Sequence, residues 1–178
     1  MPSHFRFAPY LTSAAIAAGL LFAQNAVSAQ KKGARSDPDG PDPKVALTIA
    51  LSAGTARYDF TGQGVCLEIP DGSIYGAPAA LYAVRQTGAK QRFNMTLYRL
   101  KEGGDMITLN LTIGKDTHSV STVKIGESGA LLGSGTATLE RAGTGGTLTI
   151  KATDTNGVTL AGTVKCDAFN RPRESNGL

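Results

Sequence analysis

The feature of this chain that most restricts its fold is an alternation of apolar and polar residues that recurs in short runs. The run "VALTIAL" at 45–51 has an apolar residue at every second position, and "MITLNLTI" at 106–113 repeats the pattern. Because successive side chains of a strand point to opposite faces, each run is typical of a β-strand with one buried face. No stretch has a sustained helical period, although 78–86, "PAALYAVRQ", fits either a strand or a short helix. The apolar positions of the two runs are Val45, Leu47, Ile49, Leu51, Ile107, Leu109, Leu111 and Ile113.

Short glycine-containing connections separate such runs. "KEGGD" at 101–105 predicts a hairpin connection, and the Asn156-Gly157 pair in "DTNG" favours the positive φ of a tight turn. The chain contains 22 glycines, enough to mark turns and bulges between many short strands. We therefore expect an all-β domain, a single antiparallel β-sandwich or a partly open barrel of roughly eight to ten strands closed by one disulfide.

The first part of the chain has the pattern of a secretory signal peptide at 1–29. Arg6 precedes an apolar run, "LTSAAIAAGLLF", and Val27-Ser28-Ala29 offers a small-residue cleavage site. The run is shorter than the roughly 20 residues that a membrane-spanning helix needs, so a permanent anchor is the weaker interpretation. We expect cleavage near Ala29, a secreted or periplasmic location, a bacterial source and no membrane span in the mature form.

Composition sets the other boundaries. Residues 30–43 contain three prolines and charges of both signs without a hydrophobic period, which predicts a disordered linker. The β-domain is expected at 44–170, followed by a flexible C-terminal tail at 171–178. The net charge of +4 arises from scattered basic residues, so we expect no nucleic-acid partner.

The chain has two cysteines, Cys66 and Cys166. An exported chain meets an oxidising compartment, where two cysteines allow only one intramolecular connectivity, so we predict a Cys66–Cys166 disulfide. A reactive or metal-binding thiol is the alternative, but no arrangement of histidine or lysine that would activate one is visible.

The two cysteines fit their strands unequally well. In 158–166 the alternation places Cys166 on the same face as the apolar side chains. In 64–69 the apolar set is Val65, Leu67 and Ile69, which places Cys66 on the opposite face unless a β-bulge at 62 or 64 shifts the register.

The strand rhythm and the cysteines in "GVCLEI" and "GTVKC" make the layout similar to that of small exported lipoprotein antigens of mycobacteria. In that group an early and a late cysteine close a β-sandwich. The immunoglobulin pattern is absent, because the chain has no tryptophan. No cysteine lies near the predicted cleavage site to carry a lipid, so the resemblance implies a fold and no function.

His118 is the single histidine after the predicted cleavage site. Asp116 would share its face of a strand, whereas Ser119 would point to the other face. No G-x-S-x-G motif supplies another nucleophile, and one histidine with two distant cysteines is not a zinc ligand set. We expect no catalytic residues, no metal and no cofactor. A hydrolase that uses His118 is the least favoured alternative.

The glycine- and proline-rich segment 70–84 is the candidate binding loop. It contains Tyr75 and Tyr82, and loops on rigid scaffolds commonly carry binding residues. The alternative is that both tyrosines fill one end of the sandwich. We expect a non-catalytic protein that binds an extracellular partner, a glycan or an envelope component through its loops, with 72–80 the first candidate. A purely structural or surface role is the alternative.

Overall fold

A computed structural model describes residues 41–172, which contain nine β-strands and no helix. All pairings between these strands are antiparallel, so the predicted all-β fold of roughly eight to ten strands is confirmed. The strands are β1 (Lys44–Ala53), β2 (Ala56–Ile74), β3 (Ala77–Thr87), β4 (Gln91–Leu100), β5 (Met106–Ile113), β6 (Asp116–Ser121), β7 (Ser134–Ala142), β8 (Gly145–Thr153) and β9 (Thr159–Cys166).

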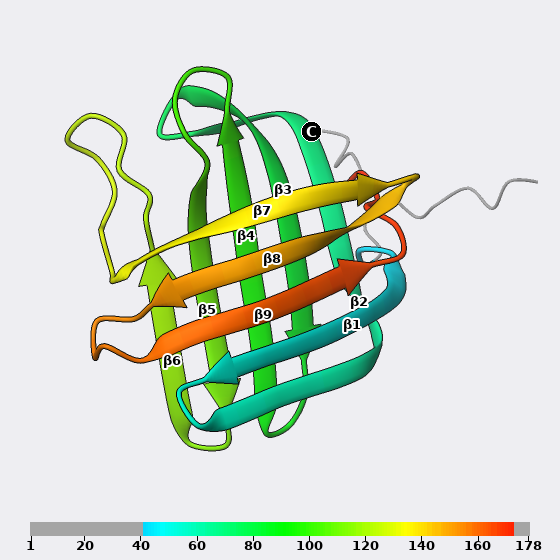
Figure 1. Ribbon diagram of the computed structural model, residues 1–178. Coiled ribbons are helices and arrows are strands. Elements are labelled where there is room, and N and C mark those ends of the chain that lie inside the picture. The colour runs from blue at the N-terminus through cyan, green and yellow to red at the C-terminus, as the bar shows by residue number, and fades with distance from the viewer. Residues whose placement is uncertain (1–40, 173–178) are drawn as a thin grey trace, which may run out of the picture. The chain divides into compact units, whose positions relative to one another are not determined.

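The strands form one sheet in the order β6-β5-β4-β3-β2-β1-β9-β8-β7. The longest strand, β2, has 19 residues and belongs to two layers. It pairs with β1 from Ala56 to Val65 and with β3 from Val65 to Ile74. In Figure 1 the strands β1, β9, β8 and β7 run across β3, β4 and β5, so the sheet folds over onto itself at β2. A strand that changes layers in this way makes the corner of an orthogonal packing.

The two edge strands of the sheet, β6 and β7, are joined at one point. The Ser121 N–H donates to the Leu132 carbonyl and the Leu132 N–H donates to the Ser121 carbonyl, each at 2.8 Å. Leu132 lies just before β7. The sheet is therefore a nearly closed barrel, which decides between the two predicted architectures.

Inward-facing side chains of both layers share one hydrophobic core. The predicted apolar faces of β1 and β5 are confirmed, because their central residues are at most 1 % exposed. The larger fully buried side chains come from β1, β2, β4, β5 and β8: Tyr58, Phe93, Leu47, Ile49, Leu51, Met95, Leu97, Ile107, Leu109, Leu111, Leu148 and Ile150.

Cys66 and Cys166 form the predicted disulfide, with their Cα atoms 6.3 Å apart. Both residues belong to the core. No β-bulge at 62 or 64 is needed to turn Cys66 inward, because the β1–β2 register runs without a shift from Ala56 to Val65.

The inward face of β2 next to Cys66 therefore carries the small residues Gly62 and Gly64. The expectation that Val65, Leu67 and Ile69 mark the core face is wrong: Leu67 is buried, at 3 % exposed, but none of the three belongs to the core cluster. The physical reason lies in the neighbouring strand. A Cβ atom at Gly64 would overlap the side chain of Leu47 of β1, which fills the space above the glycine. The core at this point is apolar because of β1, not because of β2 itself.

The C-terminal segment 167–170 lies beside the part of β2 that follows Val65, where β2 no longer pairs with β1. The Asn170 N–H donates to the Cys66 carbonyl at 2.9 Å, and the Glu68 N–H donates to the Asn170 carbonyl at 2.8 Å. The preceding residue, Phe169, is also fixed by a backbone bond, because its N–H donates to the Thr144 carbonyl at 2.8 Å. The Phe169 side chain joins the core at this end of the barrel.

The segment 70–84 is not a loop, which corrects the expectation from its glycine and proline content. It is a β-hairpin in which Tyr75 and Gly76 alone connect β2 to β3. Residues 78–86 are therefore a strand, which resolves the ambiguity between strand and helix. Pro78 is tolerated because β3 pairs with β4 only from Ala79 onward.

The predicted signal peptide, most of the predicted linker and the tail from 173 onward lie outside the described residues. Residues 41–43 have no regular secondary structure, and Asp42 lies 3.7 Å from Arg85 as an exposed ion pair. Within residues 41–172 no helix is long and apolar enough to cross a membrane.

Candidate binding sites

The β2–β3 turn presents Tyr75 at its tip with 62 % of the residue exposed. Its φ is 46°, and it is the only non-glycine residue in the described part of the chain with a positive φ. The next residue, Gly76, has a φ of 82°, so the connection has the two positive φ values of a type I′ hairpin turn. That turn favours asparagine, aspartate or glycine at its first central position, so an aromatic residue there is unusual.

A groove lies beside this hairpin, with a volume of about 300 Å³. Its apolar wall is formed by Ala77, Pro78 and Leu100, and its polar rim by Lys101 and Glu102 from the β4–β5 connection. The Lys101 N–H donates to the Pro78 carbonyl at 3.3 Å, which holds the two walls together.

Tyr82 lies elsewhere, on the inward face of β3, and is 7 % exposed. It is seven positions along the chain from Tyr75, a span of roughly 20 Å, so the structure does not bring the two tyrosines into one site. The Tyr82 hydroxyl donates to Glu68 Oε1 at 3.2 Å, and its ring meets that of Phe169 edge-on at 5.5 Å. Burial raises the pKa of Tyr82, and the adjacent Glu68 carboxylate raises it further.

Two arginines surround Tyr82 at this end of the barrel. Their guanidinium carbons, from Arg99 and Arg141, each lie 5.8 Å from the centre of the ring. Arg141 donates to Glu68 Oε2 at 2.9 Å and Arg99 lies 3.2 Å from Asp105, so both cations are paired with carboxylates. Because Arg141 belongs to β7 and Glu68 to β2, the cluster joins the two layers and closes this end. It carries no uncompensated charge that would attract a ligand.

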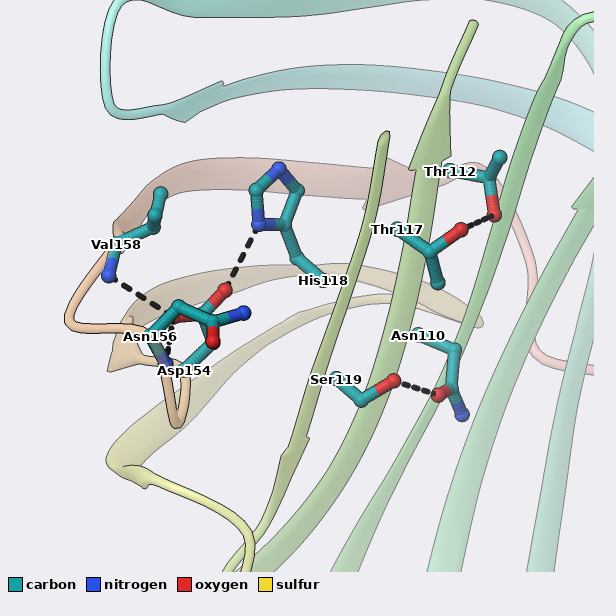
Figure 2. Close-up of polar contacts among 8 residues, drawn as sticks. All are labelled: Asn110, Thr112, Thr117, His118, Ser119, Asp154, Asn156 and Val158. Carbon is teal, nitrogen blue, oxygen red and sulfur yellow. Dashed lines mark hydrogen bonds and ion pairs between the residues drawn. The ribbon is translucent and has the colours of Figure 1, made fainter. Parts of the chain in front are cut away.

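At another place in the barrel His118 of β6 is bonded to Asp154 of the β8–β9 turn, with 2.8 Å between Nδ1 and Oδ2 (Figure 2). The Asp154 side chain is 1 % exposed and that of His118 is 12 % exposed. Oδ1 of the same carboxylate accepts the N–H groups of Asn156 and Val158, at 2.8 and 2.9 Å. These bonds, led by that of His118, hold the pKa of Asp154 below its usual value against the opposing effect of burial.

His118 and Asp154 resemble two members of a hydrolytic triad, but Ser119 does not complete it. Figure 2 shows Ser119 directed away from His118, where its hydroxyl donates to Asn110 Oδ1 at 2.8 Å. The prediction that Ser119 and His118 point to opposite faces is confirmed. Sequence reasoning missed Asp154, because 36 residues separate the partners and "DTNG" is fully explained as a turn.

A further cleft, of about 640 Å³, opens where β2 leaves β3. It contains none of the residues that the sequence singled out. Its lining comes from β2, the end of β3, the start of β4 and the connections after β3 and β5: Phe60, Gln86, Gly88, Ala89, Lys90, Gln91 and Gly114.

The fold and these sites define a class only, a disulfide-closed antiparallel barrel of nine strands with polar features at its ends and corners. In residues 41–172 no group of three or more histidine, cysteine, aspartate or glutamate side chains is placed to hold a metal ion. No family model, no curated protein and no solved structure matches the chain.

Proposed function

We propose that the protein is an exported, non-catalytic binding barrel that engages an extracellular partner, a glycan or another envelope component through the tip of the β2–β3 hairpin. The observation that carries the proposal is Tyr75, an exposed aromatic residue held in a left-handed backbone conformation. Strain of this kind costs on the order of 1 to 3 kcal/mol and is concentrated at functional sites.

Packing within the barrel does not offset this strain, because 62 % of Tyr75 is exposed. Asparagine or glycine would make the same turn at lower cost. A tyrosine at this position presents a flat apolar ring with a polar tip, the combination that serves recognition of partly apolar, partly hydrogen-bonding surfaces. The conformational cost is understandable if the ring contacts a ligand.

A glycan is the ligand class that the surroundings of Tyr75 favour. The apolar face of a pyranose ring stacks on an aromatic side chain, and its hydroxyl groups need both donors and acceptors nearby. The adjoining groove offers Lys101 as a donor and Glu102 as an acceptor at its rim. The disulfide is consistent with an oxidising compartment, where such ligands occur.

The test is to screen the purified mature chain against envelope polysaccharides and a glycan panel, and then to compare it with the Tyr75→Asn variant. Asparagine suits the turn, so the thermal midpoint should not fall, whereas binding should weaken at least about ten-fold. Leu131→Asn is the matched control, since Leu131 is 58 % exposed in a different connection.

Two results would contradict the proposal. One is the absence of any ligand in the screen. The other is a Tyr75→Asn variant that binds as tightly as the wild type while the Leu131→Asn variant also retains its affinity.

A further inference from the structure

The corner cleft exists because β2 changes layers. β2 pairs with β3 only from Val65, whose partner is Arg85. Residues 56–64 pair with β1 alone, and the last residues of β3, Gln86 and Thr87, pair with β4 alone. The two layers therefore separate at this corner, and the cleft of about 640 Å³ opens between Phe60 on one side and the β3–β4 connection on the other.

Gln86 is a polar side chain held in a defined orientation beside this cleft. It is 7 % exposed, and its Oε1 accepts the hydroxyl proton of Tyr58, which is fully buried. Burial raises the pKa of Tyr58 to about 12, so its phenol keeps the proton and remains a donor throughout the physiological range. A buried hydroxyl needs an acceptor, and this requirement fixes the Gln86 carbonyl oxygen toward Tyr58.

The amide nitrogen of Gln86 is thereby left for the cleft. Among the hydrogen bonds of residues 41–172, none uses Gln86 Nε2 as a donor. Gln86 is itself one of the residues that line the cleft. Gly88, a cleft residue, lies next to it: a Cβ atom there would be 3.3 Å from Nε2.

The wall opposite β2 is held in place by backbone hydrogen bonds. The Gly88 N–H donates to the Gln91 carbonyl at 2.8 Å, and the Gly114 N–H donates to the Lys90 carbonyl at 2.9 Å. The β3–β4 and β5–β6 connections are thus joined before any ligand is present. Pre-formed sites of this kind avoid the entropic cost of ordering a loop on binding.

The charged side chains that line the corner cleft and its adjoining hollow are basic. Lys90 lines the cleft, and Lys90 and Arg92 both line an adjoining hollow of about 240 Å³. Within the described chain, no aspartate or glutamate lines either space. Phe60 contributes an aromatic ring that is packed against the core and only partly buried.

We propose that the corner cleft binds a small organic anion, a carboxylate attached to a flat apolar ring. The carboxylate accepts hydrogen bonds from Gln86 Nε2 and from the Lys90 ammonium group, and the ring packs on Phe60. Charge-assisted hydrogen bonds to a carboxylate are about twice as strong as neutral ones, which makes the charge of the ligand part of the recognition. This site is separate from the hairpin tip and does not depend on the function proposed for Tyr75.

The proposal is tested with three probes on the full mature chain: 2-naphthoate, its neutral analogue 2-naphthamide, and acetate. Amide chemical shifts followed by NMR report both the affinity and the place of binding. We expect 2-naphthoate to bind and to shift the amides of 86–91, 2-naphthamide to bind about ten-fold more weakly, and acetate to bind more weakly still.

Variants then assign the contacts. Lys90→Met, which keeps the aliphatic stem, should weaken 2-naphthoate several-fold and leave 2-naphthamide unchanged. Gly88→Ala should weaken both, because its methyl group crowds Gln86 Nε2 and lies 3.2 Å from the Gln91 carbonyl oxygen. Lys151→Met, at an exposed position in β8, is the matched control and should bind like the wild type.

Three outcomes would overturn the proposal: no shift of the 86–91 amides with 2-naphthoate, equal affinity for the naphthoate and the naphthamide, or unchanged naphthoate binding by both Lys90→Met and Gly88→Ala. The Tyr75→Asn variant separates the two proposals, because it should lose glycan binding and retain 2-naphthoate binding.

Discussion

Removing the Cys66–Cys166 disulfide should lower the free energy of unfolding by several kcal/mol. The bond joins residues 100 apart in sequence, and for a loop of this length the chain-entropy argument gives about 4.7 kcal/mol. Replacing both cysteines by alanine also removes two buried sulfur atoms. A buried methylene contributes about 0.8 kcal/mol, so the two sulfurs add roughly 1.5 kcal/mol. The expected total of about 6 kcal/mol is a large share of the 5 to 15 kcal/mol typical of a domain.

Two measurements separate these contributions. Urea unfolding of the wild type under reducing conditions removes the covalent link but keeps both sulfur atoms, so it should show the loss of about 4.7 kcal/mol alone. The Cys66→Ala/Cys166→Ala variant should show the further packing loss. Mass spectrometry of the unreduced exported chain should detect no alkylatable thiol.

The reasoning fails if reduction of the wild type lowers the free energy of unfolding by less than about 1.5 kcal/mol. That result would mean that the unfolded chain gains little freedom from the loss of the link. Two free thiols in the native exported protein, or a dimer linked through either cysteine, would refute the disulfide itself.

Three further perturbations have expected outcomes. His118→Ala should lower the free energy of unfolding by about 1.5 to 3 kcal/mol, since Oδ2 of the buried Asp154 carboxylate loses its partner while Oδ1 keeps the N–H groups of Asn156 and Val158. Neither protein should turn over ester, glycoside or peptide substrates; turnover by the wild type that the variant lacks would contradict this. The lowered pKa of Asp154 contributes stability that is present above the usual aspartate pKa of about 4 and is lost as the pH falls through the folded-state pKa. In urea titrations the difference in unfolding free energy between the wild type and Asp154→Asn should therefore shrink as the pH is lowered, and a difference that stays constant down to about pH 2 would refute this. Gly162→Ala should lower the free energy of unfolding by at least about 2 kcal/mol, because the φ of Gly162 is 149° and a Cβ atom there would overlap the Ala50 carbonyl. Gly143→Ala is the control: the space around Gly143 is open, so the same urea assay should show a loss of only about 1 kcal/mol from backbone strain.

The parts of the fold that depend on local pattern could be predicted from the sequence. The inward faces of β1 and β5 follow from strict alternation, and the β8–β9 turn follows from Asn156-Gly157. The disulfide follows from the cysteine count and the expected compartment. Each of these depends on neighbours in sequence or on a single possible pairing.

The parts that depend on contacts between distant strands could not be predicted. The inward face of β2 at Gly64 is apolar only because Leu47 of β1 covers it. The partner of His118 is 36 residues away, and no local signal links it to Asp154. The hairpin at 70–84 could not be predicted because its glycines and prolines are typical of loops. All of them except Gly76 lie in the strands, which end at Ile74 and resume at Ala77.

The corner cleft could not be predicted for the same reason, because it also depends on contacts between residues far apart in sequence. The local sequence around Gln86 predicts only the end of an ordinary strand. The orientation of its side-chain amide depends on the hydroxyl of Tyr58, 28 residues earlier. The change of layer within β2 is what brings the two residues together, and no residue in that strand signals it by type.

The order of the strands also places the first and last strands of the chain, β1 and β9, beside each other. β1 pairs with β9, so Leu47 lies opposite Cys166, and the Asp167 N–H donates to the Ala46 carbonyl at 3.1 Å. A short linker could therefore join residue 170 to residue 44, with new ends opened in the exposed connection at 126–131. Such a circular permutant would keep every strand neighbour of the barrel. It would also turn the β1–β9 pairing, which has the widest sequence separation of the pairings between the nine described strands, into a local hairpin, and should therefore fold faster than the natural order.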